Sequence, residues 1–135
     1  MPGLLSDVNI DGQMKCLHTR LVTGPFREEW LALGIAFLDF ADVRWDRALP
    51  DDQVWTRCQE NDLMLITDNR NGHGPNSLEV TIRKHGGPGH WPVFTISRSE
   101  HLLRSRAYVD RVAERLMEFL IDCEACRGTG RLYLP

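Results

Sequence analysis

The sequence lacks a long hydrophobic run and a large excess of either charge. No apolar stretch approaches the roughly 20 residues that a membrane-spanning helix needs. The first residues, MPGLLSD, do not combine a basic segment with a long apolar one, as a signal peptide does. We therefore expect a cytoplasmic protein with no membrane association. A net charge of −3 argues against binding nucleic acid by bulk charge alone, but it leaves room for a local basic patch.

Cysteine is scarce, and free thiols are the expectation for a reducing compartment. The four cysteines are Cys16, Cys58, Cys123 and Cys126. The last two open a C-x-x-C-x-G-x-G segment that resembles one copy of the zinc-binding element of certain cochaperones. A structural zinc ion needs four ligands and one copy supplies two, so we do not expect zinc at Cys123 and Cys126. The alternative is that Cys123 ends the last helix and that Gly128 and Gly130 form a turn.

The chain also lacks internal repeats, a domain boundary and a G-x-S-x-G nucleophile motif. Its 135 residues fit one domain, and that length can bury about two-thirds of the unfolded surface. Hydrophobic residues make up 42% of the chain and charged residues 26%, which is an ordinary globular balance. The composition therefore predicts one domain that is stable without disulfides.

Short apolar runs alternate with amphipathic stretches along the chain. The runs predict strands near residues 4–5, 35–38, 63–67 and 93–96, with a short edge strand within 131–135. The amphipathic stretches predict helices at 11–22, 26–33, 51–60, 77–84 and, most strongly, 109–121, whereas 41–50 reads as irregular. Strands separated by helices imply right-handed crossovers, and therefore a parallel sheet with helices on both faces.

Aspartates lie at or just after the ends of three predicted strands, at Asp7, Asp39 and Asp68. The carboxyl ends of parallel strands line the ligand crevice of an α/β sheet. Carboxylates gathered there repel one another, so a proton or a cation usually accompanies them. Oxygen ligands suit Mg²⁺ or Mn²⁺, which points to metal-assisted phosphate chemistry. The alternative is that these residues form turns and cap helices.

Three segments together resemble a PIN-like domain, and more narrowly the small bacterial, cyanobacterial-type PIN-like proteins related to toxin ribonucleases. They are LLSDVNIDGQ, PDDQVWTRCQEND and LMLITDNRN. The resemblance implies a three-layer α/β/α fold around a central, mostly parallel sheet of four or five strands. It places the PIN-like domain at residues 1–122 and leaves 123–135 as a C-terminal extension packed on the same domain.

The resemblance also implies a Mg²⁺- or Mn²⁺-dependent endoribonuclease that hydrolyses phosphodiester bonds. Its metal-binding and catalytic acids would be Asp7, Asp52 and Asp68, although Asp51 matches the second acid equally well. Its substrate-binding residues would be Asn9, Arg70 and Asn71. The partners that it implies are RNA and a protein partner such as an antitoxin, and the chain could form a homodimer.

The segment after the third predicted strand departs from the family pattern. Relatives usually read Thr-x-Asp-x-Asp, whereas this chain reads Thr67-Asp68-Asn69-Arg70-Asn71. Asparagine can coordinate a cation through its carbonyl oxygen, but it adds no negative charge. Side chains alternate along a strand, so the shift of one residue can aim Asp68 elsewhere. Two functions stay open: the endoribonuclease, or a catalytically silent module that binds RNA or protein.

Basic residues follow the fourth predicted strand, at Arg98, Arg104, Arg106 and Arg111. Such a cluster can guide RNA to the crevice, although it also fits an ordinary set of surface ion pairs. Trp45 and Trp91 lie in predicted loops, where an aromatic ring either stacks on a base or packs against the protein.

Overall fold

Five short strands form one parallel sheet in a computed structural model that describes residues 2–70 and 74–135. The order across the sheet is β2-β1-β3-β4-β5, and every neighbouring pair is parallel. The strands are β1 (Gly3–Ser6), β2 (Phe37–Leu38), β3 (Leu63–Thr67), β4 (Val93–Ile96) and β5 (Arg131–Leu134). The predicted parallel α/β sheet is therefore confirmed, and the residues after 130 contribute its fifth strand.

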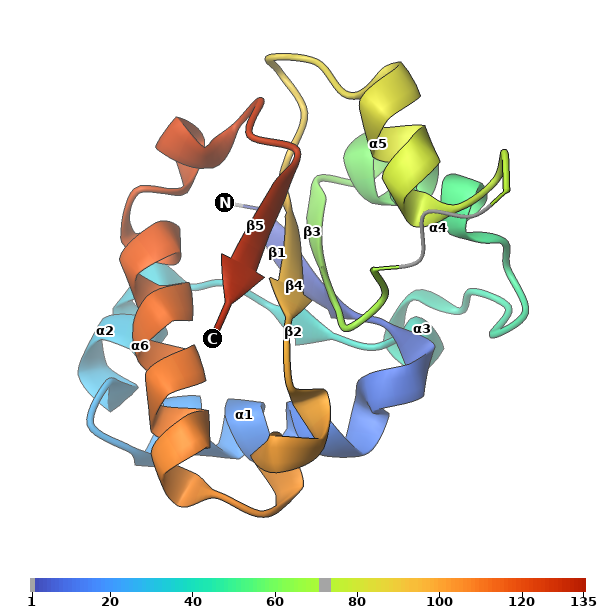
Figure 1. The fold of residues 1–135 in the computed structure, drawn as a ribbon. Helices are drawn as coiled ribbons and strands as arrows, with labels where there is room; N and C mark the ends of the chain where they lie inside the picture. Colours follow the sequence, from blue (N-terminus) through green and yellow to red (C-terminus); the bar gives the residue numbers. More distant parts are fainter. Residues whose placement is uncertain (1, 71–73) are drawn as a thin grey trace.

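Helices cover both faces of this sheet, which gives the three layers expected from the sequence (Figure 1). One face carries α1 (Asp11–Thr23), α2 (Arg27–Leu33) and α6 (Arg106–Ile121). The other carries α3 (Phe40–Val43), α4 (Asp51–Glu60) and α5 (Leu78–His85). Three short 3₁₀ helices, η1 (Val8–Ile10), η2 (Ser99–Leu103) and η3 (Cys123–Cys126), complete the chain.

The central strand β3 shows why both faces need cover. All five of its residues are buried. Leu63 and Leu65 pack toward α4 and α5, while Met64 and Ile66 pack toward α1 and α6. A continuous apolar run is the expected sequence of a strand that is buried on both sides.

Local signals set the helix boundaries. Ser77 and Ser105 cap α5 and α6, because each hydroxyl accepts a hydrogen bond from the backbone N–H three residues later. Gly34 ends α2 in the left-handed conformation, with φ of 66°, which glycine adopts without steric cost. The predicted helix is confirmed as α6, and its buried side matches the apolar pattern from Val109 to Leu120. Ile121, which the pattern also placed on the buried side, is 65% exposed.

The stretch 41–50 is less irregular than its composition suggested, because α3 begins at Phe40. Asp39 is the N-cap of this helix: its side chain accepts a hydrogen bond from the backbone N–H of Asp42, and the Asp42 side chain accepts one from the backbone N–H of Asp39. This reciprocal arrangement satisfies donors that a short helix would otherwise leave unpaired. Asp39 therefore has a local capping role.

Within residues 2–70 and 74–135, no helix combines the length and the apolar character that crossing a bilayer requires.

Core packing predicts a large difference between two identical substitutions. Leu4 lies in β1 with 0% of its surface exposed, whereas Leu31 on α2 is 54% exposed. Leu4→Ala should lower the free energy of unfolding by about 2–5 kcal/mol, because it removes buried contacts and leaves a cavity. Leu31→Ala, the matched control, should change it by less than about 0.5 kcal/mol. Urea unfolding followed by circular dichroism measures both, and equal losses would contradict the fold.

Candidate functional site

Asp7, the first residue after β1, is held at the carboxyl end of the sheet. Only 8% of its surface is exposed. One carboxylate oxygen, Oδ1, accepts a hydrogen bond from the backbone N–H of Val8 at 2.8 Å, and Oδ2 accepts one from the Thr67 hydroxyl at 2.6 Å. Because Thr67 ends β3, this second bond joins the ends of two adjacent strands.

A chain of hydrogen bonds continues from Thr67 to α4. The Thr67 hydroxyl oxygen accepts from the backbone N–H of Asn69 at 3.0 Å. The Asn69 side-chain amide donates to Oδ2 of Asp51 at 2.9 Å. Asp51 is the first residue of α4, so Asp7, Thr67, Asn69 and Asp51 form one polar network between the two central strands and this helix.

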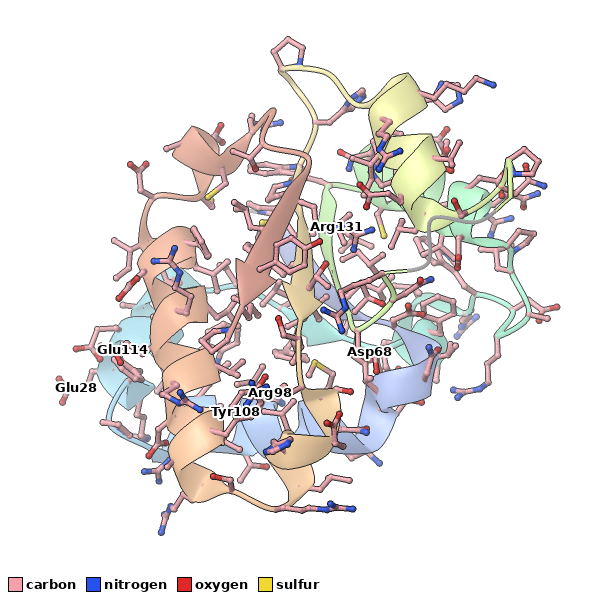
Figure 2. The ribbon with its side chains drawn as sticks, in the orientation of Figure 1. Glu28, Asp68, Arg98, Tyr108, Glu114 and Arg131 are labelled. Carbon is pink, nitrogen blue, oxygen red and sulfur yellow. The ribbon has the colours of Figure 1, made fainter. Side chains whose placement is uncertain are left out.

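Asp68 turns toward the opposite helical layer. Its Oδ2 accepts a hydrogen bond from the hydroxyl of the buried Ser99 at 2.7 Å, at the start of η2 (Figure 2). Alternation along the strand explains the direction, because Thr67 follows the side of Leu65 and Asp68 follows the side of Ile66. The one-residue shift in the sequence therefore separates Asp68 from the network around Asp7.

Asp51 and Asp68 are still close enough to Asp7 to affect its charge. The pKa of Asp7 is raised above its ordinary value of 3.8, chiefly because burial disfavours the charged form. Hydrogen bonds from Thr67 and Val8 oppose this change in pKa, while the negative charges of Asp51 and Asp68 add to it.

The structure places Asp51, rather than Asp52, in the hydrogen-bond network of Asp7. Oδ1 of Asp52 accepts a hydrogen bond from the backbone N–H of Gln53 at 3.0 Å, so this carboxylate serves the first turn of its own helix. Asn9 is exposed in η1, and Arg70 is exposed beyond β3. Asn71 lies outside the described residues.

These acids do not form a ready cation site. Within the described ranges, no three or more histidine, cysteine, aspartate or glutamate side chains are grouped so that they could hold a metal ion. Both oxygens of Asp7 already accept hydrogen bonds, and so does one oxygen each of Asp51 and Asp68. Mg²⁺ demands near-octahedral oxygen ligands, so a cation here would share these carboxylate oxygens with the hydrogen-bond donors that already contact them.

The two late cysteines belong to the packing of η3. Cys123 and Cys126 are both buried and free of disulfides. The thiol of Cys126 lies 3.7 Å from the carbonyl oxygen of Phe119 and 3.9 Å from that of Asp122. Burial raises the pKa of both thiols, which disfavours the thiolate form that metal binding needs.

A buried arginine supports the acidic edge, and sequence reasoning missed it. Arg131 of β5 has a side chain that is only 6% exposed. Its guanidinium donates to the carbonyl oxygen of Asn69 at 2.8 Å, to the Thr95 hydroxyl at 2.7 Å and to Glu79 at 2.9 Å. Figure 2 labels Arg131 on this strand. No local signal could have revealed it, because its partners come from distant parts of the chain.

The arginines after β4 lie at the surface, whereas the two loop tryptophans pack against the protein. Arg104 and Arg106 line a groove of about 510 Å³ between α1 and the segment from η2 to α6. The Arg111 guanidinium lies 5.4 Å from the ring centre of Tyr108, whose hydroxyl accepts a hydrogen bond from the backbone N–H of Arg98 (Figure 2). The loop tryptophans pack: Trp45 contacts the ring of Phe40, and Trp91 is buried.

Comparison with known proteins gives no relative. The chain matches no protein-family model, no curated protein and no solved structure. The chain has a small α/β fold with a five-stranded parallel sheet.

Burial of Asp7 predicts a specific dependence of stability on pH. Because the folded pKa of Asp7 lies above the unfolded one, the folded state binds the proton more tightly, and stability falls as pH rises through that interval. Asp7→Asn cannot titrate there. Its free energy of unfolding relative to the unmodified protein should therefore rise as the pH increases from the ordinary carboxyl pKa of 3.8 through the raised pKa of Asp7. Urea titrations in the presence of EDTA measure this difference, and a pH-independent difference would refute the effect.

Proposed function

We propose that this chain is a PIN-like domain that binds single-stranded RNA without cleaving it. The observation that carries the proposal is the groove between α1 and the segment from η2 to α6. Four basic side chains line it, from Lys15, Arg20, Arg104 and Arg106. The parallel sheet with helices on both faces agrees with the architecture that the family resemblance implies.

The groove offers free positive charge despite the chain's net charge of −3. Arg20 pairs with Asp110 at 2.6 Å. Across the described residues, Lys15, Arg104 and Arg106 form no ion pair at bonding distance, although the charge of Arg106 lies near enough to help lower the pKa of Asp110. Their side chains can therefore donate to phosphate groups. Leu103, which also lines the groove, is 57% exposed and gives an apolar surface on which an unpaired base can pack.

The acidic edge supports binding without turnover. Metal-assisted phosphodiester hydrolysis needs carboxylates that converge on a cation. Here the Thr67 hydroxyl donates to Asp7, and the Asn69 amide donates to Asp51. Asp68 lies apart from them and accepts from Ser99. The asparagine at position 69 thus fills space near two acids with an amide and adds no negative charge.

A second candidate is the Mg²⁺- or Mn²⁺-dependent ribonuclease. One observation favours it: the charges of Asp51 and Asp68 both raise the pKa of Asp7. The three carboxylates are therefore close enough to interact, and a cation among them would relieve their repulsion. In that function Asp7, Asp51 and Asp68 would hold the metal.

RNA binding through the groove can be tested with a charge-matched pair of variants. Arg104→Ala/Arg106→Ala removes two groove cations, and it should weaken binding of a short, unstructured, uridine-rich RNA at least about tenfold. The slope of log affinity against log salt should fall by about 1.4, or roughly 0.7 for each lost contact with a single strand. Fluorescence anisotropy at several salt concentrations measures both quantities.

The control for that experiment is Arg83→Ala/Arg115→Ala, which removes the same charge from exposed positions outside the groove. It should bind RNA like the unmodified protein. If both double variants lose affinity equally, only net charge matters and the groove is not the binding surface.

Catalysis is tested separately with Mn²⁺ after removal of bound metal by EDTA. The silent module should show neither a stoichiometric micromolar Mn²⁺ site by calorimetry nor RNA cleavage. Cleavage that requires Mn²⁺ and disappears in Asp7→Asn would instead establish the ribonuclease. Asp52→Asn is the matched control, because among the described contacts the Asp52 side chain accepts only from the backbone N–H of Gln53.

A further inference from the structure

A second hollow, of about 460 Å³, lies at the opposite end of the sheet from the acids. The loops before β4 and β5 meet there, at the amino ends of these strands (Figure 1). Its wall includes the side chains of Trp55, Ile82, Pro88, His90, Trp91 and Arg127. That volume, and a largely apolar and aromatic lining with few polar groups, are typical of sites for small molecules.

The two loops hold each other in place. The backbone N–H of Gly128 donates to the carbonyl oxygen of His90 at 3.0 Å, and the Arg127 guanidinium donates to that of Gly89 at 2.7 Å. Gly128 has φ of 82°, and a Cβ atom there would lie 3.0 Å from Cα of Pro88. Only glycine allows this approach without strain, so the wall of the hollow is built into the fold.

The Trp91 ring is held by hydrogen bonds and stacks against the Arg127 guanidinium. Its indole N–H donates to Asp62 at 2.6 Å, and its backbone exchanges two hydrogen bonds with the side chain of Gln59. The Arg127 guanidinium lies 3.6 Å from the centre of the indole ring. Such stacking holds the planar cation in one orientation.

Arg127 keeps donors for an anion. A guanidinium has five N–H donors. Among the described residues, Arg127 uses them toward Glu124 at 2.7 Å and Gly89 at 2.7 Å. The pair with Glu124 is at the surface, where ion pairs contribute little and are screened by salt. The remaining donors suit phosphate oxygens.

His90 supplies an unsatisfied polar atom at the same wall. Its Nδ1 is buried and has no hydrogen-bond partner in the part of the chain that is described. Its ring lies 5.0 Å from that of Trp55, centre to centre. Buried polar groups in proteins are nearly always paired. This nitrogen is covered by protein atoms, so His90 offers the hollow its ring rather than this atom.

We propose that this hollow binds a mononucleotide, meaning a planar heteroaromatic ring that carries a phosphate group. Trp55 and His90 provide aromatic contact for the ring. Arg127 binds the phosphate. The site is separate from both the acidic edge and the basic groove, so it does not depend on RNA binding there.

The test is titration of AMP, GMP, CMP and UMP into the full chain, followed by calorimetry and tryptophan fluorescence. At least one nucleotide should bind saturably at one site. Arg127→Met should weaken it at least tenfold, to the level of the corresponding nucleoside without phosphate. Arg115→Met is the matched control, since Arg115 also stacks on a ring, that of Phe119, and pairs with Glu118, but lies outside the hollow.

A second variant tests the cavity itself. A Cβ at Gly87 would meet Nδ1 of His90 at 3.6 Å, an ordinary contact, so Gly87→Leu should fold and fill the hollow. It should abolish nucleotide binding and leave RNA binding in the groove unchanged. Gly89→Leu, in the same loop with open space around its Cβ, is the control. Absence of saturable binding for all four nucleotides, or unchanged binding in Arg127→Met or Gly87→Leu, would overturn the proposal.

Discussion

The hydrogen bond from Thr67 to Asp7 is the constraint on which the acidic edge depends. Pairing of β1 with β3 brings these residues together, with the Thr67 hydroxyl 2.6 Å from the carboxylate. The same hydroxyl accepts from Asn69, whose amide reaches Asp51, so one threonine organises three elements. A carboxylate without a nearby cationic partner is costly to bury, and hydrogen bonds to the charged form offset part of that cost. Asp7 therefore keeps a raised pKa even though both of its oxygens are hydrogen-bonded.

Much of this fold could be predicted from the sequence, because its signals are local and periodic. The apolar run of β3, the heptad-like spacing of α6 and the serine caps at 77 and 105 all specify elements without reference to distant residues. The short helix α3 escaped prediction, since its stability comes from the reciprocal caps of Asp39 and Asp42 rather than from an apolar pattern. β5 was predicted as a short edge strand, which is its place in the sheet, but its parallel pairing with β4 is a tertiary fact.

The candidate site was predictable as a location but not as an arrangement. Strand ends identify Asp7 and Asp68, yet strand alternation sends Asp68 to Ser99 in the opposite layer. Asp51 and Asp52 are equivalent in the sequence, and only the orientation of α4 decides that Asp51 meets Asn69. Arg131 is a tertiary feature of the same kind: its guanidinium is committed to Glu79, Thr95 and the backbone of Asn69. It braces the segment after β3 but does not donate to the carboxylates themselves.

The C-x-x-C-x-G-x-G segment packs against the core and shapes the turn between α6 and β5. Its cysteines face the core, where burial raises the pKa of both thiols. Its glycines, Gly128 and Gly130, both have positive φ, and the backbone at Gly128 passes close to Pro88. The cysteines thus lie in the 3₁₀ helix η3 that follows α6, and the glycines allow the backbone before β5 to pass close to Pro88. Arg127 follows the buried cysteines and precedes these glycines in the sequence. The same turn, between η3 and β5, therefore also holds the Arg127 guanidinium against the Trp91 ring, where both residues line the hollow.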